Sequence, residues 1–177
     1  MTRACRKRAK VAISRCLLGE KVSYDATHNF CSELSRFSEN NFEVVAFCPE
    51  VETGMGVPRL PIRLSLDHGA IRACRVNDVC CDYTKQLSSY AANFVSTHPD
   101  LVAIINKKGS PSCGYLSTKL FDNETLVNAV SSGIFISEVL RLKPEILIID
   151  EMNFMLSAER KAFLAAIKKA LVKQGFF

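Results

Sequence analysis

Four short apolar segments along the chain are each long enough for one buried strand and too short for a buried helix. We predict strands over residues 11–14, 43–47, 101–105 and 146–149. Segments with helical patterns separate them, and strands that alternate with helices favour a parallel sheet joined by right-handed crossovers. The predicted fold class is therefore α/β: a single three-layer, Rossmann-like domain with a mostly parallel sheet and helices on both faces.

Apolar residues recur at steps of three or four between residues 78 and 97, which predicts one long amphipathic helix. The apolar positions of this helix are Val79, Tyr83, Leu87, Tyr90 and Phe94. Further expected elements are helices over residues 30–39, over residues 125–132 and from Ser157 onward, and a strand over residues 134–136. Residues 53–69 contain glycine and proline too often for a regular element, so we expect a loop there.

The net charge of +5 comes entirely from the first ten residues. Residues 1–10 contain five Lys or Arg side chains, whereas residues 11–177 contain 18 basic and 18 acidic ones. We therefore expect a basic N-terminal arm over residues 1–10 and one α/β domain over residues 11–177. The domain has no basic surplus of the kind typical of nucleic-acid-binding proteins. A solvated arm is the main interpretation, and weak attraction to RNA or an anionic surface is the alternative.

Hydropathy argues against a membrane protein. No segment approaches the ~20 consecutive apolar residues of a membrane-spanning helix. Arg15 interrupts the apolar stretch that follows the basic arm, which is not the pattern of a secretory signal. We expect a cytoplasmic protein, and the sequence leaves its oligomeric state open.

The chain contains eight cysteines, a high content for a sequence without an export signal. In a reducing cytosol such residues bind metals, react or pack as small apolar side chains more often than they form disulfides. Cys16, Cys48 and Cys113 each fall in a turn that follows a predicted strand, and ligands bind beyond the carboxyl ends of parallel strands. Three converging thiolates there would suit a soft metal or an iron–sulfur cluster. Buried packing of the three thiols is the alternative.

Polar residues close to these cysteines could complete a site. Glu50 lies two residues after Cys48, and a carboxylate beside a metal can act as a general base, although a surface salt bridge is the alternative. Ser110 and Ser112 could donate to a substrate oxygen or sulfur, or could simply cap their turn. A polar loop could line a pocket or form a local turn; its candidate side chains are Tyr24, Asp25 and His28.

The remaining cysteines are expected to be incidental to the chemistry. Cys5 belongs to the basic arm, and Cys31 and Cys74 have no ligand-like neighbours in the sequence. Cys80 and Cys81 fall inside the predicted long helix, where consecutive side chains point about 100° apart. That divergence is a poor arrangement for two ligands of one site.

Five motifs follow one another in a distinctive order. They are Ser14-Arg15-Cys16-Leu17-Leu18-Gly19, Val22-Ser23-Tyr24-Asp25, Phe47-Cys48-Pro49-Glu50, Pro58-Arg59-Leu60-Pro61 and Ser110-Pro111-Ser112-Cys113-Gly114. Together they resemble the thiouracil desulfidase family over about residues 11–140. The resemblance implies a hydrolytic, non-redox desulfidase that converts C=S to C=O on a small thiolated nucleobase such as thiouracil.

The same resemblance implies a cofactor and roles for individual residues. A [4Fe-4S] cluster would be held by Cys16, Cys48 and Cys113, with its fourth iron free of a protein ligand. The catalytic residues would be Glu50 and Ser110. The residues expected to bind substrate are Tyr24, Asp25, His28 and Ser112.

Two other classes of function remain open at this point. One is a non-catalytic protein whose cysteines hold structural zinc or deliver sulfur to a partner, and metal analysis distinguishes zinc from iron with labile sulfide. The other is a thiol enzyme with Cys113 as nucleophile, although no recognisable histidine partner motif accompanies that residue. The substrate itself, whether free base, nucleoside or tRNA, is not fixed by the sequence.

Overall fold

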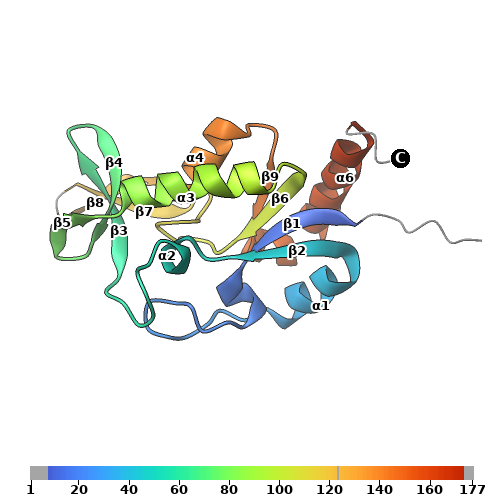
Figure 1. Ribbon diagram of the computed structural model, residues 1–177, viewed down its shortest axis with the longest axis horizontal. Helices are drawn as coiled ribbons and strands as arrows, with labels where there is room; N and C mark the ends of the chain where they lie inside the picture. Colours follow the sequence, from blue (N-terminus) through green and yellow to red (C-terminus); the bar gives the residue numbers. More distant parts are fainter. Residues whose placement is uncertain (1–7, 123, 174–177) are drawn as a thin grey trace, which may run out of the picture.

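The computed structural model describes residues 8–122 and 124–173 of the 177-residue chain (Figure 1). Residues 1–7 of the predicted basic arm lie outside the described residues. The first strand begins at Ala9, so Ala9 and Lys10 belong to the sheet and not to an arm. Within the described residues, no helix is both long and apolar enough to cross a membrane.

The first of two sheets is parallel and has four strands. Its strands, in spatial order, are β2 (Phe42–Phe47), β1 (Ala9–Ser14), β6 (Leu101–Asn106) and β9 (Leu147–Asp150). Each of the three pairings is parallel. This confirms the sheet predicted from the four apolar segments. Since the chain moves from β1 to one side and later returns to the other, the strand order reverses at β1, where α/β sheets bind ligands.

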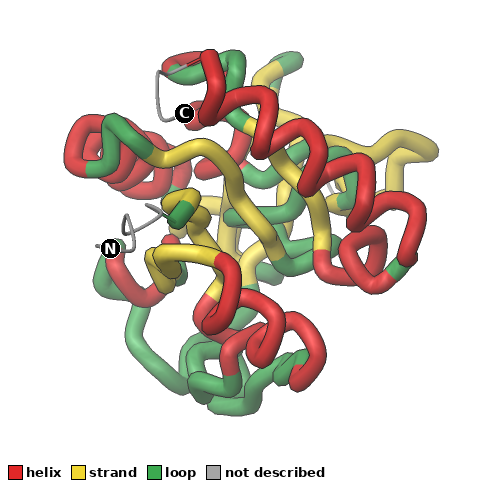
Figure 2. Tube along the Cα trace, turned by 90° about the vertical axis from the view of Figure 1, so that its right-hand side faces the viewer, coloured by secondary structure: helices red, strands yellow, loops and turns green. Residues whose placement is uncertain are grey.

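Helices cover both faces of this sheet (Figure 2). The helices on one face are α1 (Ser32–Asn41), α5 (Glu151–Met155) and α6 (Ser157–Lys173), and those on the other are α3 (Thr84–Thr97) and α4 (Ile134–Leu142). Val11 and Ile13 of β1 pack with Phe154 on the first side, and Ala12 packs with Phe135 on the second. Alternate residues of one buried strand therefore serve two cores, which explains its uninterrupted apolar sequence.

A second, five-stranded sheet was not predicted. Its order is β5 (Asp78–Asp82), β4 (Ala70–Arg75), β3 (Ile62–Asp67), β7 (Thr118–Asp122) and β8 (Thr125–Ser131). All its pairings are antiparallel except that between β3 and β7. Helix α3 runs from this sheet to the parallel one (Figure 1), with Leu87 in the core beside Leu64 and Phe94 in the core beside Phe47.

Four predictions from the sequence are wrong in and next to this second sheet. Residues 53–69 are not all loop, because Ile62–Asp67 form strand β3, which pairs with β4 through a tight turn where His68 and Gly69 adopt positive φ. The predicted helix over residues 78–97 begins only at Thr84, and the residues before it form β5. Residues 125–132 form strand β8, and residues 134–136 open helix α4.

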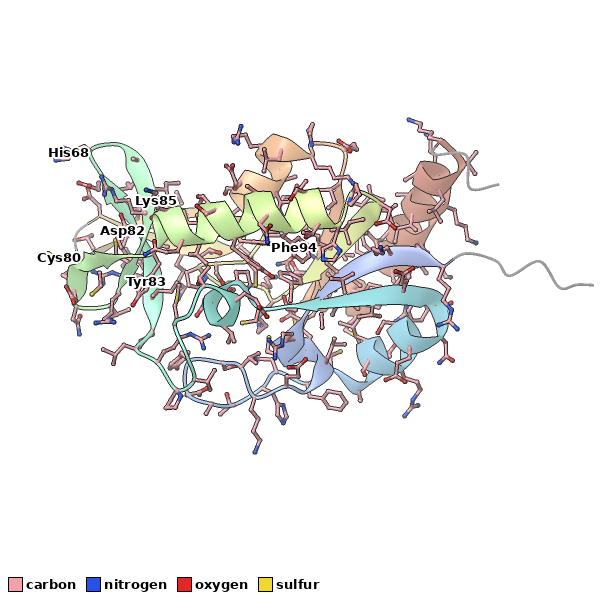
Figure 3. All side chains as sticks on the ribbon, viewed as in Figure 1. His68, Cys80, Asp82, Tyr83, Lys85 and Phe94 are labelled. Atoms are coloured by element: carbon pink, nitrogen blue, oxygen red, sulfur yellow. The ribbon has the colours of Figure 1, made fainter. Side chains whose placement is uncertain are left out.

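The reason for the last two errors is Gly133. We expect from the sequence that this glycine ends a helix, but it has φ −60° and ψ 154° and instead precedes the first turn of α4. Cys80 and Cys81 consequently lie on a strand and not on a helix. Figure 3 shows Cys80 at the end of the molecule furthest from the parallel sheet.

Candidate active site

A cavity of about 440 Å³ lies at the carboxyl ends of β1, β2 and β6. Its wall includes Cys16, Cys48 and Cys113, which follow those three strands. Glu50 and Ser110 line the same cavity. The structure therefore brings together residues that are 32 and 65 positions apart in the sequence, at the strand-order reversal where the sheet topology leaves a crevice.

Each cysteine is presented by a short, tightly turned segment. Cys16 lies on the single-turn helix η1 (Arg15–Leu18), which Gly19 ends at a positive φ of 97°. Cys48 is the N-cap of α2 (Pro49–Glu52), where proline suits the first helical position because it has no N–H to leave unbonded. Both turns begin within one residue of a strand end, so the thiols stay close to the edge of the sheet.

Cys113 lies in a loop that is packed directly against the start of α4. The backbone N–H groups of Ile134 and Phe135 donate to the carbonyls of Pro111 and Ser112 at 3.2 and 2.9 Å. A Cβ on Gly114 would come within 2.7 Å of the Ser110 carbonyl oxygen. Glycine is therefore required there by the close approach of the backbone.

Burial dominates the electrostatics of the three thiols. It raises the pKa of Cys16 to about 12 and that of Cys48 to about 11, and it also raises the pKa of Cys113. The three thiols also act on one another, since Cys113 raises the pKa of both Cys16 and Cys48. A free thiolate, the nucleophile of a thiol enzyme, is thus disfavoured in this cavity. Coordination to a metal would supply the positive charge that deprotonates such thiols.

The chemistry of this donor set fits an iron–sulfur cluster. Across residues 8–122 and 124–173, no three His, Cys, Asp or Glu side chains lie close enough to hold one metal ion. A cluster binds each cysteine at a different iron, so its thiolates are further apart than those around a single ion. Cys16, Cys48 and Cys113 on the wall of one cavity are compatible with that wider spacing.

Glu50 is the centre of a buried polar network. It lies on α2 and is 9% exposed, so it is not the surface residue of the alternative interpretation. The hydroxyl of Ser112 donates to Glu50 Oε1 at 2.7 Å, and Nε of Arg59 donates to Oε2 at 2.8 Å. A guanidinium and a hydroxyl donor therefore fix the orientation of this carboxylate through charge-assisted hydrogen bonds.

Two serines continue this network to the cysteine loop. The Oγ atoms of Ser110 and Ser112 are 3.0 Å apart, and the backbone N–H of Cys113 donates to Ser110 Oγ at 3.2 Å. Ser112 was predicted to bind substrate, but its hydroxyl contacts the Glu50 carboxylate and only 1% of the residue is exposed. Ser110 is the less buried of the two hydroxyls on the cavity wall.

The predicted polar loop is only partly at the site. Tyr24 and Asp25 line the cavity, and the N–H and hydroxyl of Thr27 lower the pKa of Asp25 by donating to its carboxylate. His28 does not line the cavity: it is exposed, and its Nδ1 accepts a hydrogen bond from the N–H of Phe30 at 3.3 Å.

Three side chains at the site had no role assigned from the sequence. Arg59 pairs with Glu50, Ser14 Oγ lies 3.5 Å from the sulfur of Cys113, and Lys107 Nζ pairs with Glu151 at 2.7 Å on the cavity edge. Arg59 and Ser14 do fall inside the quoted motifs. Their position within those motifs could have indicated that they belong to the site. The direction of their side chains depends on tertiary packing and could not be predicted.

Comparison with known proteins bears on the family and the fold of the chain. The sequence profile of the 2-thiouracil desulfurase family matches residues 11–151. The solved structure of a [4Fe-4S]-dependent thiouracil desulfidase, TudS, superposes with a TM-score of 0.65 and 22% sequence identity, over 89% of this chain and 99% of that one. At that identity the likeness establishes a shared fold, which confirms the predicted α/β class. No curated protein sequence matches the chain closely.

Proposed function

The chain belongs to the 2-thiouracil desulfurase family, and from this premise we propose that it is a hydrolytic desulfidase for a thiolated heterocycle such as thiouracil. The reaction replaces C=S by C=O without a change of redox state. The observation that carries the proposal is the convergence of three strand-end thiols with the buried Glu50 carboxylate in one cavity.

The proposed cofactor is a [4Fe-4S] cluster, as in the enzyme of similar fold. Cys16, Cys48 and Cys113 would each bind one iron through a thiolate. When bound, the cluster would supply an iron without a protein ligand, a Lewis acid that polarises the thiocarbonyl sulfur. Cys16 also lies near the Lys107 ammonium, which acts on its pKa in the opposite direction to burial.

Glu50 acts as the general base of the proposed reaction. It takes one proton from a water molecule whose oxygen forms the new bond to the thiocarbonyl carbon. That proton and the second proton of the water leave with the sulfur, so that water and C=S become C=O and hydrogen sulfide. Arg59 and Ser112 keep the carboxylate oriented, and Ser110 offers its hydroxyl to the substrate.

The cavity wall suits a small, flat ring. Val22, Pro61 and Ile62 contribute apolar surface, and the aromatic ring of Tyr24 is half exposed beside them. Polar side chains, among them Asp25, Glu50 and Ser110, line the same cavity. A heterocycle could therefore place its faces against apolar atoms while its thiocarbonyl points to the three cysteines.

The test is anaerobic reconstitution with iron and sulfide, followed by sulfide-release assays on 2-thiouracil, 4-thiouracil and their nucleosides. We expect the broad visible absorption of a cubane cluster and release of sulfide with formation of the oxo product. Zinc without labile sulfide on metal analysis would contradict the proposal and indicate a structural site. Full activity in iron-free protein, lost on alkylation of Cys113, would contradict it in favour of a thiol enzyme.

A further inference from the structure

We propose that Arg59 is a positioning residue that determines which oxygen of the Glu50 carboxylate accepts the proton; this rests on the proposed function. The two side chains are 7% and 12% exposed, so the ion pair is almost fully removed from solvent. Nε and Nη2 of Arg59 both lie 2.8 Å from the same oxygen, Oε2. The guanidinium thus approaches one oxygen side-on and does not bridge both.

The two oxygens of the Glu50 carboxylate have different hydrogen-bond donors around them. Each carboxylate oxygen has about two acceptor sites. Nε of Arg59 donates to Oε2, and Nη2 lies 2.8 Å from the same oxygen, whereas the hydrogen bond that Oε1 accepts comes from Ser112. Within the part of the chain that the structure describes, Ser112 is the one hydrogen-bond donor to Oε1, so this oxygen retains an acceptor site on the side that faces the Ser110–Cys113 loop. That oxygen is the one placed to receive a proton from water.

The remaining donors of Arg59 fix the guanidinium itself. Nη1 donates to the carbonyl of Gly56 and Nη2 to the carbonyl of Val22, both at 2.9 Å. The backbone N–H of Arg59 donates to the carbonyl of Tyr24 at 2.8 Å. One residue therefore holds the 22–24 segment of the cavity wall, its own loop at Gly56 and the Glu50 side chain together. Only the planar fork of arginine can do so, because lysine offers one ammonium group.

These contacts predict an effect on the chemical step that depends on Glu50. We expect Arg59→Met to lower kcat per bound cluster by about 10²-fold, the loss typical of a reacting group displaced by about 1 Å. Arg59→Lys should restore only a small part of kcat, because it keeps the charge and loses the fork. Visible absorption of the cluster should be unchanged, since the side-chain hydrogen bonds of Arg59 go to Glu50, Gly56 and Val22 and not to a cysteine.

A double-mutant cycle with Glu50→Gln separates positioning from a general structural role. If Arg59 acts through Glu50, Arg59→Met should cause no further loss of kcat in the Glu50→Gln background. Arg72→Met is the matched control: it removes an arginine that pairs with Asp67 and Asp82 on the second sheet, and kcat should stay within twofold of wild type.

Two results would overturn the inference. One is an equal loss of kcat from Arg59→Met in the wild-type and Glu50→Gln backgrounds, and the other is wild-type kcat in Arg59→Lys. If Arg59→Met does not fold, the same cycle is run with Arg59→Lys, where the expected result is again non-additive. Wild-type protein that releases sulfide in the same preparation keeps the proposed function intact when the inference fails. Absence of sulfide release from the wild type would overturn both.

Discussion

The two sheets both carry cysteines, but only the parallel sheet gathers them. Cys16, Cys48 and Cys113 follow three parallel strands whose carboxyl ends meet at one edge, and all three line one cavity. In the second sheet the largely antiparallel pairing sends neighbouring strand ends to opposite edges, and its cysteines line no part of that cavity. Strand direction, more than residue type, therefore decides which thiols can share a ligand.

We expect the largest loss of activity from substitution of Cys113, the most buried of the three cysteines on the cavity wall. Replacing it by serine should abolish the visible cluster absorption, and sulfide release should fall to the level of the buffer. Cys80→Ser, on an exposed position of the second sheet, is the matched control and should retain both. Visible absorption and the content of iron and sulfide measure cluster binding. An equal loss of both in the two variants would contradict the claim that only the cysteines beside the parallel sheet bind the cluster.

The next effect concerns two glutamates of the same short helix. Glu50→Gln removes the proposed base and should lower kcat by about 10²- to 10⁴-fold, the usual contribution of acid–base catalysis, with cluster absorption retained. Glu52→Gln changes a partner of Arg15 that does not line the cavity, and kcat should change little. Sulfide-release kinetics measure both, and a similar rate in the two variants would remove Glu50 from the mechanism.

The second sheet should matter for stability instead of chemistry. Leu87 of α3 is fully buried against Leu64, so Leu87→Ala should lower the free energy of unfolding by about 2–5 kcal/mol. The exposed Leu126 of β8 provides the control, with a change below about 0.5 kcal/mol expected for Leu126→Ala. Denaturant unfolding gives these values; a changed kcat per cluster in folded Leu87→Ala would show that the second sheet also shapes the active site.

The smallest expected effect is the pH dependence of a carboxylate at the start of α3. Burial raises the pKa of Asp82, but the hydrogen bonds from Thr84 and Arg72 together lower it by more. The pKa of Asp82 is therefore below the ordinary value of 3.8. Because the folded pKa is depressed, this stabilisation is present above the unfolded-state pKa and is lost as pH falls through the folded one.

Asp82→Ala should therefore destabilise the protein at pH 7 and less so at an acidic pH below the folded-state pKa. We expect about 0.5–2 kcal/mol at pH 7, as for other residues that bond to the first turn of a helix. Thermal unfolding at the two pH values measures the difference. The exposed Glu145 gives a control, because Glu145→Ala should change stability by less than about 0.5 kcal/mol at either pH. An equal loss at both pH values for Asp82→Ala would contradict the charge-based account.

The parallel sheet was predictable because its strands are buried on both faces. A continuous apolar run such as that of β6, where all six residues are buried, is visible in the sequence without knowledge of its neighbours. The predicted meeting of the cysteines follows from the same feature, since it needs only parallel strands and their ends. The helices from Ser32 and from Ser157 were also found, the first with its start shifted by two residues.

The second sheet was missed because its strands depend on tertiary contacts. Strand β8 is largely exposed, and its Leu126 and Val130 are four residues apart, which imitates a helical period. Val79 and Tyr83 extend the helical spacing of α3 backwards by chance. At the site, the sequence placed Arg59 within a motif but did not predict its ion pair with Glu50, because that pair depends on how the 54–61 loop folds back over α2.

The arrangement of the three cysteines has a mechanical consequence. A shared cofactor bound at residues 16, 48 and 113 would act as a cross-link that closes two long loops of chain at the sheet edge. Such closure restricts the unfolded chain most when the linked residues are far apart, and metal binding contributes directly to folding free energy. Oxygen damage to the cofactor would then lower the melting temperature along with the activity.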